Sequence, residues 1–175
     1  PKVSVDLTAS IQPVDFERED VDVAVHFGTI DERSGLHHSL LFPVAIVPVC
    51  SPALINSRRP LRRPSDLQNY TLLHTLVRPD DWRKWLGANG VSAEWATHGY
   101  RFESSSMAYD AAINGIGVAI AVTAFVEDDL KEGRLVVPFP MNLSTPDGYW
   151  VVHPPRKTAN PAVIVFRDWI IEEAK

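Results

Sequence analysis

Apolar and polar residues alternate along several short stretches of this chain, and between them apolar residues recur at helical spacing. Val3, Val5 and Leu7 alternate with polar residues, which predicts a strand over residues 3–8, and a second strand is predicted over residues 21–28. Further strands are predicted over residues 72–74, 99–102, 118–122, 134–137 and 149–153, and a turn over residues 144–148. Helices are predicted to begin at Ser51, Ser65, Asp80, Ser104, Thr123 and Asn160.

The stretch over residues 102–121 carries the strongest local signals in the chain. Ser104 and Ser105 are good helix N-caps, small apolar residues follow at helical spacing, and Asn114-Gly115 provides a left-handed stop. Residues 118–122 form an apolar run of the size of a strand that is covered on both faces. Serine hydroxyls beside the free N–H groups of a helix N-terminus suit a small polar or anionic ligand, and plain capping explains the same residues.

The order of these elements predicts an α/β protein with largely parallel sheets, because strands alternate with helices. Two proline-marked segments, residues 44–48 and 139–146, divide the chain. They predict one domain made of residues 1–43 with 147–175, and a second domain over residues 49–138 inserted into it. Two domains joined by two crossing strands form a hinged pair with a cleft, and such clefts hold small ligands.

The amino-acid composition of the chain excludes several classes of function. The chain has 175 residues, a net charge of −5 and a single cysteine, Cys50, which excludes an internal disulfide and is expected to be a buried, inert thiol. The acidic balance argues against a broad nucleic-acid surface. Residues 1–5 show no secretory leader pattern, and no apolar run reaches the length of a membrane span. The one basic cluster, Arg58, Arg59, Arg62 and Arg63, is expected to be a solvated loop, with phosphate contact as the alternative.

Motifs that carry catalysis or bind cofactors are missing from the sequence. It contains no Gly-rich dinucleotide or phosphate loop, no nucleophile elbow, no C-x-x-C and no H-E-x-x-H. His37 and His38 are adjacent, so on a strand they point to opposite faces and suit a metal poorly. We therefore expect no cofactor, no metal and no enzymatic activity.

Several stretches taken together resemble the effector-binding domain of LysR-type transcriptional regulators. The closest subgroup is the one that contains the glycine-cleavage activator and the β-lactamase regulator AmpR. The resemblance covers essentially the whole chain. It is carried by Val21-Asp22-Val23-Ala24-Val25-His26-Phe27-Gly28, Pro48-Val49-Cys50-Ser51-Pro52-Ala53-Leu54, Pro64-Ser65-Asp66-Leu67, Asp81-Trp82-Arg83-Lys84-Trp85-Leu86, Phe102-Glu103-Ser104-Ser105, Gly115-Ile116-Gly117-Val118-Ala119-Ile120 and Phe166-Arg167-Asp168-Trp169-Ile170.

The resemblance implies two Rossmann-like subdomains of periplasmic-binding-protein type, joined by two crossover strands, with a small effector bound between them. In such regulators the effector site uses the start of the helix after the F-x-D/E-S motif, the loop after the second strand and an aromatic strand before the last helix. In the AmpR-like branch the second serine and the tyrosine contact a muropeptide, which here implies Ser105 and Tyr149. The implied effector-binding residues are Ser104, Ser105, Tyr149, His26, Phe27, Gly28 and Thr123.

Two departures from the family pattern change these expectations. His26 stands where the subgroup usually has Arg, so an acidic group would be held less firmly there at neutral pH. The chain also starts after the family's first strand and helix, and the resemblance implies that the helix-turn-helix lies outside it.

The resemblance further implies a cytoplasmic regulator that is a homodimer or tetramer at full length, reaches promoter DNA through the absent helix-turn-helix and does not contact a membrane. The alternatives are a solute-binding protein of a transport system and, third, a transferase-type enzyme on the same fold.

Overall fold

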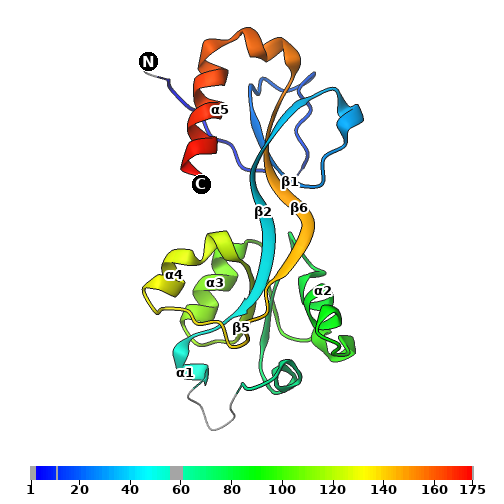
Figure 1. Ribbon diagram of the computed structural model, residues 1–175, viewed down its shortest axis with the longest axis vertical. Helices are drawn as coiled ribbons and strands as arrows, with labels where there is room; N and C mark the ends of the chain where they lie inside the picture. Colours follow the sequence, from blue (N-terminus) through cyan, green and yellow to red (C-terminus); the bar gives the residue numbers. More distant parts are fainter. Residues whose placement is uncertain (1–2, 11, 56–60, 175) are drawn as a thin grey trace. The chain divides into compact units, whose positions relative to one another are not determined.

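The computed structural model describes residues 3–10, 12–55 and 61–174, which fall into two compact units. The terminal unit is Pro1–Val44 with Thr145–Lys175, and the central unit is Ala45–Ser144. The chain passes between the units along two strands, β2 (His37–Val49) and β6 (Leu143–His153), which can be followed in Figure 1. The terminal unit is therefore built from two segments that are distant in sequence, whereas the central unit is one continuous segment.

In the terminal unit, β1 pairs antiparallel with β6 from Ala24↔Val152 to Gly28↔Gly148. Helix α5 begins after Asn160, whose side-chain oxygen accepts a hydrogen bond of 3.0 Å from the N–H of Ala162, so the predicted helix start is confirmed. Besides its parts of β2 and β6, this unit contains β1 (Ala24–Gly28), the 3₁₀ helices η1 (Glu32–Ser34) and η5 (Pro155–Ala159), and α5 (Pro161–Glu173).

In the central unit the strands lie in the order β2-β5-β3-β4. β3 runs parallel to both β4 and β5, and β5 runs antiparallel to β2. The strands and α-helices of this unit are α1 (Pro52–Ile55), β3 (Leu72–Thr75), α2 (Asp81–Ala88), β4 (Tyr100–Phe102), α3 (Ser105–Ile113), β5 (Val118–Val122) and α4 (Glu127–Lys131). Its 3₁₀ helices are η2 (Pro64–Asn69), η3 (Glu94–Thr97) and η4 (Thr123–Phe125).

The core of the central unit is built around β5, all five residues of which are buried, as the apolar run predicts. Ala108 and Ala112 of α3 are fully buried, and their small side chains let the helix pack closely on the strands. Figure 1 shows α3 and α2 on opposite sides of β5. The Nε1–H of Trp82 on α2 donates a 3.1 Å hydrogen bond to the carbonyl of Leu73 in β3, which ties that helix to the sheet.

Cys50 follows β2 and is fully buried, as expected. Burial raises the pKa of its thiol to about 11, so the thiolate that would react is scarce at neutral pH. Among the described residues, no helix combines the length and the apolar character needed to span a membrane.

Two predicted elements, the strand over residues 3–8 and the turn over residues 144–148, are wrong because the presence or absence of a paired neighbouring strand determines the local structure. Residues 3–8 form no strand, Leu7 is 91% exposed, and alternation alone cannot make a strand where no neighbouring strand supplies hydrogen bonds. The predicted turn over residues 144–148 lies inside β6. Gly148 is needed there for packing, since a Cβ atom on it would lie 2.8 Å from Nε1 of Trp150.

Other predictions are corrected in detail. The predicted strand over residues 134–137 is reduced to one bridge between Cys50 and Val136. The sheet is mixed rather than largely parallel, because β1 pairs antiparallel with β6 and β2 pairs antiparallel with β5. The helix expected at Ser65 is the 3₁₀ helix η2, which begins one residue earlier, and Arg63 at its N-cap position makes no side-chain capping bond. Asp80 likewise makes no side-chain capping bond to α2.

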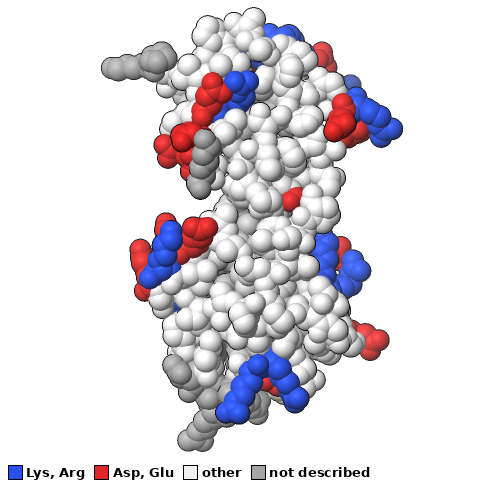
Figure 2. Space-filling view, in the orientation of Figure 1, with Lys and Arg blue, Asp and Glu red and all other residues white. Residues whose placement is uncertain are grey.

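The basic cluster is only partly described. Arg58 and Arg59 lie outside the described residues, whereas the backbone N–H groups of Arg62 and Arg63 both donate to the carboxylate of Asp66. On the face in Figure 2, Lys and Arg lie beside Asp and Glu, which agrees with paired contacts such as Lys131 with Glu127. This interspersed pattern fits the exclusion of a broad basic surface.

His74 on β3 should make the chain sensitive to acid. Burial lowers the pKa of His74, and the positive charge of Arg101 acts in the same direction, while the hydrogen bond from Nε2–H to the carbonyl of His98 opposes them. Below the ordinary histidine pKa of 6.5 the unfolded chain takes up a proton that the folded chain resists. The free energy of unfolding should therefore fall as the pH drops through this value.

Urea melts between about pH 8 and pH 5 measure this loss. The loss should be smaller in His74→Gln, whereas His98→Gln, at an exposed histidine, should keep the wild-type slope. Equal slopes in the wild type and His74→Gln would show that His74 is not responsible.

Candidate functional site

Two serines at the start of α3 differ in their roles: Ser104 caps the helix, whereas the hydroxyl of Ser105 does not. Ser104 is the N-cap, with an extended backbone, and its Oγ accepts a 3.4 Å hydrogen bond from the N–H of Met107. Ser106 lies 3.1 Å away, from Oγ to Oγ. Ser105 is the first helical residue, is half-buried, and its hydroxyl makes no hydrogen bond to another residue that the structure describes. Capping therefore falls on Ser104, as predicted, and leaves Ser105 available.

Replacing Ser104 by alanine should lower the free energy of unfolding by about 1 kcal/mol, because the N–H of Met107 loses its capping acceptor. Ser105→Ala is the matched control and should change it by less than about 0.5 kcal/mol. Urea denaturation of both variants is the measurement, and an equal loss in the two would contradict the division of roles.

Thr123 follows β5 but does not cap a helix, which corrects the sequence prediction. α4 begins only at Glu127, after Val126, and residues 123–125 form a short 3₁₀ turn. The Thr123 hydroxyl donates a 3.2 Å hydrogen bond to the carbonyl of Ala45 in β2. Its proton is thus used within the central unit, and only its oxygen lone pairs could serve a ligand.

The predicted aromatic residues come together in the terminal unit. Phe27 on β1 lies directly opposite Tyr149 on β6, and the centroids of the two rings are 5.3 Å apart. The ring centroid of Phe42 lies 5.0 Å from that of Tyr149. All three rings are partly exposed. Such a cluster offers an apolar surface with one phenolic hydroxyl, the combination that binds a small amphipathic group.

His26 and Gly28 lie on the other face of β1. Successive residues of a strand point to opposite faces, and the register places His26 opposite Trp150 and Gly28 opposite Gly148. The Nε1–H of Trp150 donates a 2.9 Å hydrogen bond to the carbonyl of Gly28, which uses that carbonyl. The structure thus joins Phe27 with Tyr149 and separates His26 from both.

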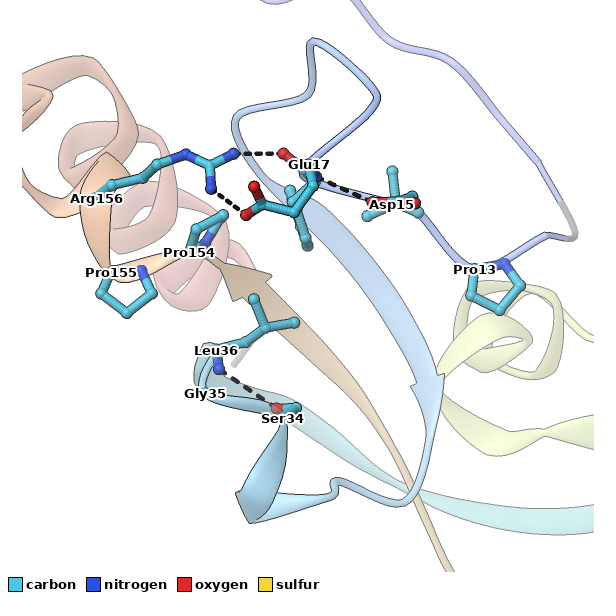
Figure 3. Close-up of a pocket in the computed structure, with 11 residues that line it drawn as sticks. Pro13, Asp15, Glu17, Ser34, Gly35, Leu36, Pro154, Pro155 and Arg156 are labelled. Carbon is cyan, nitrogen blue, oxygen red and sulfur yellow. Dashed lines mark hydrogen bonds and ion pairs between the residues drawn. The ribbon is translucent and has the colours of Figure 1, made fainter.

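Two pockets in the described residues contain none of the seven predicted residues. The pocket of the terminal unit has a volume of about 590 Å³, and its charged groups are already paired: the Arg156 guanidinium bonds the Glu17 carboxylate at 2.5 Å and the carbonyl of Phe16 (Figure 3). The pocket of the central unit, of about 530 Å³, is lined by Trp95 and His98 among others.

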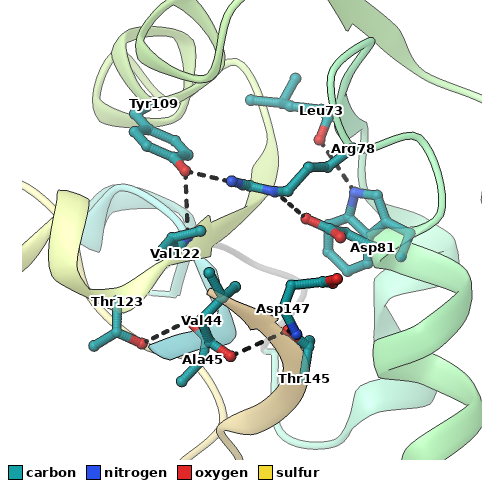
Figure 4. Close-up of polar contacts among 11 residues, drawn as sticks. Val44, Ala45, Leu73, Arg78, Asp81, Tyr109, Val122, Thr123, Thr145 and Asp147 are labelled. Carbon is teal, nitrogen blue, oxygen red and sulfur yellow. Dashed lines mark hydrogen bonds and ion pairs between the residues drawn. The ribbon is translucent and has the colours of Figure 1, made fainter. Parts of the chain in front are cut away.

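Sequence reasoning missed a buried polar network in the central unit. The Arg78 guanidinium donates to the Asp81 carboxylate at 2.7 Å and to the Tyr109 hydroxyl at 3.3 Å, and the same hydroxyl accepts a 3.2 Å bond from the N–H of Val122 (Figure 4). Burial by itself would lower the pKa of Arg78, but Tyr109 and Asp81 together hold this pKa above its usual range, so the guanidinium stays charged. The network joins the segment before α2 to α3 and to the end of β5.

The whole chain, residues 1–175, matches the family model described as the LysR substrate binding domain. The glycine cleavage system transcriptional activator of Escherichia coli K12 is 33% identical over 177 residues, which cover 99% of this chain and 56% of that protein. The chain thus spans about half the length of this curated relative. This relative is a transcriptional activator.

Solved structures agree with this match. The effector domain of the transcriptional regulator AmpR of Pseudomonas aeruginosa is 30% identical, with a TM-score of 0.78 over 94% of this chain and 77% of that one. A Citrobacter freundii effector binding domain in which a threonine, a serine and a tyrosine are replaced is 25% identical, with a TM-score of 0.79, covering 95% of this chain and 81% of that one. The α/β fold with two subdomains is the fold of these effector-binding domains.

Proposed function

This chain belongs to the LysR substrate-binding domain family, and from that premise we propose that it senses a small effector for a bacterial transcription regulator. The observation that carries the proposal is the match of the family model to residues 1–175. The regulator would act on promoter DNA through a helix-turn-helix outside these residues, and it would work in the cytoplasm.

We propose that the effector contacts include Ser105 and Tyr149. Two features support this: the Ser105 hydroxyl has no partner among the described residues, and Tyr149 is part of a partly exposed aromatic cluster with Phe27. A serine and a tyrosine were also chosen for replacement in the similar Citrobacter freundii domain. Ser104 and Gly28 would shape the site, His26 would contact a group on the other face of β1, and Thr123 would offer only an acceptor.

The two subdomains are proposed as residues 1–43 with 147–175 and residues 49–138, with residues 44–48 and 139–146 as hinge crossovers. The division into compact units supports this, because both of its boundaries, after Val44 and after Ser144, fall inside the proposed crossovers. An effector would change the balance of two conformations by binding one of them more tightly.

A thermal-shift assay tests effector binding directly. A muropeptide, glycine and benzoate represent the three probe classes: peptidoglycan fragments, amino acids and aromatic acids. A probe at about 100 times its Kd should stabilise the chain by roughly 2.7 kcal/mol and raise its Tm accordingly. A flat Tm with every probe class would count against effector sensing by this chain.

Self-association is expected for the full regulator and, more weakly, for this chain. α5 has Val163 as its one buried residue, and Trp169 on the same helix is 54% exposed, so much apolar surface is available for an isologous contact. Sedimentation of the chain from low to high micromolar concentration should show a rising average mass. A monomer at every concentration would contradict the expectation.

A further inference from the structure

Two consecutive carbonyls of β2 are held by threonine hydroxyls at the point where this strand passes from one unit to the other. The Thr145 hydroxyl donates to the carbonyl of Val44 in the terminal unit, and the Thr123 hydroxyl donates to the carbonyl of Ala45 in the central unit. Both oxygen–oxygen distances are 3.2 Å. Figure 4 shows both contacts. The boundary between the units falls between Val44 and Ala45.

Side-chain hydrogen bonds reach the β2 backbone here, next to the point where its pairing with β5 begins. β2 lies between β6 and β5 in strand order, and consecutive carbonyls of a strand point to opposite edges. The backbone pairing of β2 with β5 starts at Ile46↔Val122, one residue after Ala45. The carbonyls of residues 44 and 45 are thus satisfied by hydroxyls, one toward the β6 edge and one toward the β5 edge.

Each threonine is itself anchored inside its own unit. Thr123 follows Val122, whose N–H is fixed by the buried Tyr109 hydroxyl. The Thr145 oxygen accepts a 3.3 Å bond from the N–H of Asp147 while it donates to Val44. Both hydroxyls therefore connect the junction of β2 to fixed points, one in each unit.

We propose that Thr123 and Thr145 are positioning residues of a hinge in β2, each holding the end of the strand that belongs to its own unit. A hydroxyl turns about a single bond, so it can keep its acceptor while the backbone dihedrals at the junction change, whereas a backbone N–H in a ladder cannot. Loss of either hydroxyl frees its carbonyl and loosens the junction. This inference rests on the proposed hinge role of residues 44–48.

Distances between spin labels, one in each unit, test the inference. Glu32→Cys and Glu94→Cys place labels at exposed positions of the terminal and central units, while buried Cys50, with its raised thiol pKa, stays unlabelled. Thr123→Val and Thr145→Val should each broaden or shift the distance distribution relative to the wild type. Thr123→Ser and Thr145→Ser keep the hydroxyl and should restore the wild-type distribution.

The control separates hinge positioning from general stability. Thr75→Val changes a buried threonine of β3 and should leave the distribution as it is. If a valine variant does not fold, the alanine variant at the same position replaces it, with circular dichroism as the check. Unchanged distributions in folded Thr123 and Thr145 variants would overturn the inference, while the thermal shift with effector probes would stand unaffected.

Discussion

Replacing Asp81 by alanine should lower the free energy of unfolding by about 3–5 kcal/mol. The Asp81 and Arg78 side chains are only 9% and 4% exposed, and the pair lies 2.7 Å apart. Without the carboxylate, the buried guanidinium keeps its charge but loses its 2.7 Å ion pair with Asp81, and that attraction no longer offsets the cost of burying the charge. Urea denaturation followed by circular dichroism measures the loss.

Asp80→Ala provides the matched control one residue away. Asp80 pairs with Arg83 at 3.0 Å, but both side chains are more than half exposed, so its loss should cost at most about 1 kcal/mol. Similar losses for Asp80→Ala and Asp81→Ala would show that burial of the Arg78–Asp81 pair does not matter for stability.

Replacing Gly117 by alanine should cost about 3 kcal/mol, at the upper end of the range for overpacking. A Cβ atom on Gly117 would lie 2.3 Å from the carbonyl oxygen of Thr71, and a backbone atom cannot move aside as a side chain can. The same carbonyl accepts a 2.9 Å bond from the N–H of Val118, so relief of the clash would disturb the start of β5.

Gly87→Ala is the matched control for this substitution. A Cβ atom there meets nothing within 4 Å, and Gly87 is a helical residue of α2. Alanine is the better helix former, so this variant should gain about 0.5 kcal/mol. A loss of similar size in both glycine variants would contradict the steric account of Gly117.

Elements that depend on local chemistry were predictable from the sequence. Ser104 as the cap of α3, Asn160 as the cap of α5 and the buried strand at residues 118–122 all follow from capping and apolar signals within a few residues. The same local signals misled where tertiary pairing decides. The turn-forming residues before Tyr149 lie in β6, a strand that lies between β1 and β2 in the sheet, and this tertiary pairing overrides their turn preference.

The candidate site was predictable only through the family resemblance. Residue chemistry alone left capping and ligand contact open at the serines, and it offered no sign that Phe27 and Tyr149 would pair across two strands. Arg78 and Asp81 were missed because an Arg–Asp pair three residues apart is common on protein surfaces. Burial of that pair arises from α3 and β5, which are distant in sequence.

The central claim, that this chain senses a small effector through residues that include Ser105, is tested most directly by calorimetric titration. The wild type and Ser105→Ala would be titrated with the probe that gives the largest thermal shift among muropeptide, glycine and benzoate. Loss of one hydrogen bond worth about 0.5–1.5 kcal/mol should raise Kd by roughly two- to tenfold, with the urea melt unchanged. An equal Kd for the wild type and Ser105→Ala would contradict the account. If the variant also melted at lower urea, Ser105 would be a structural residue.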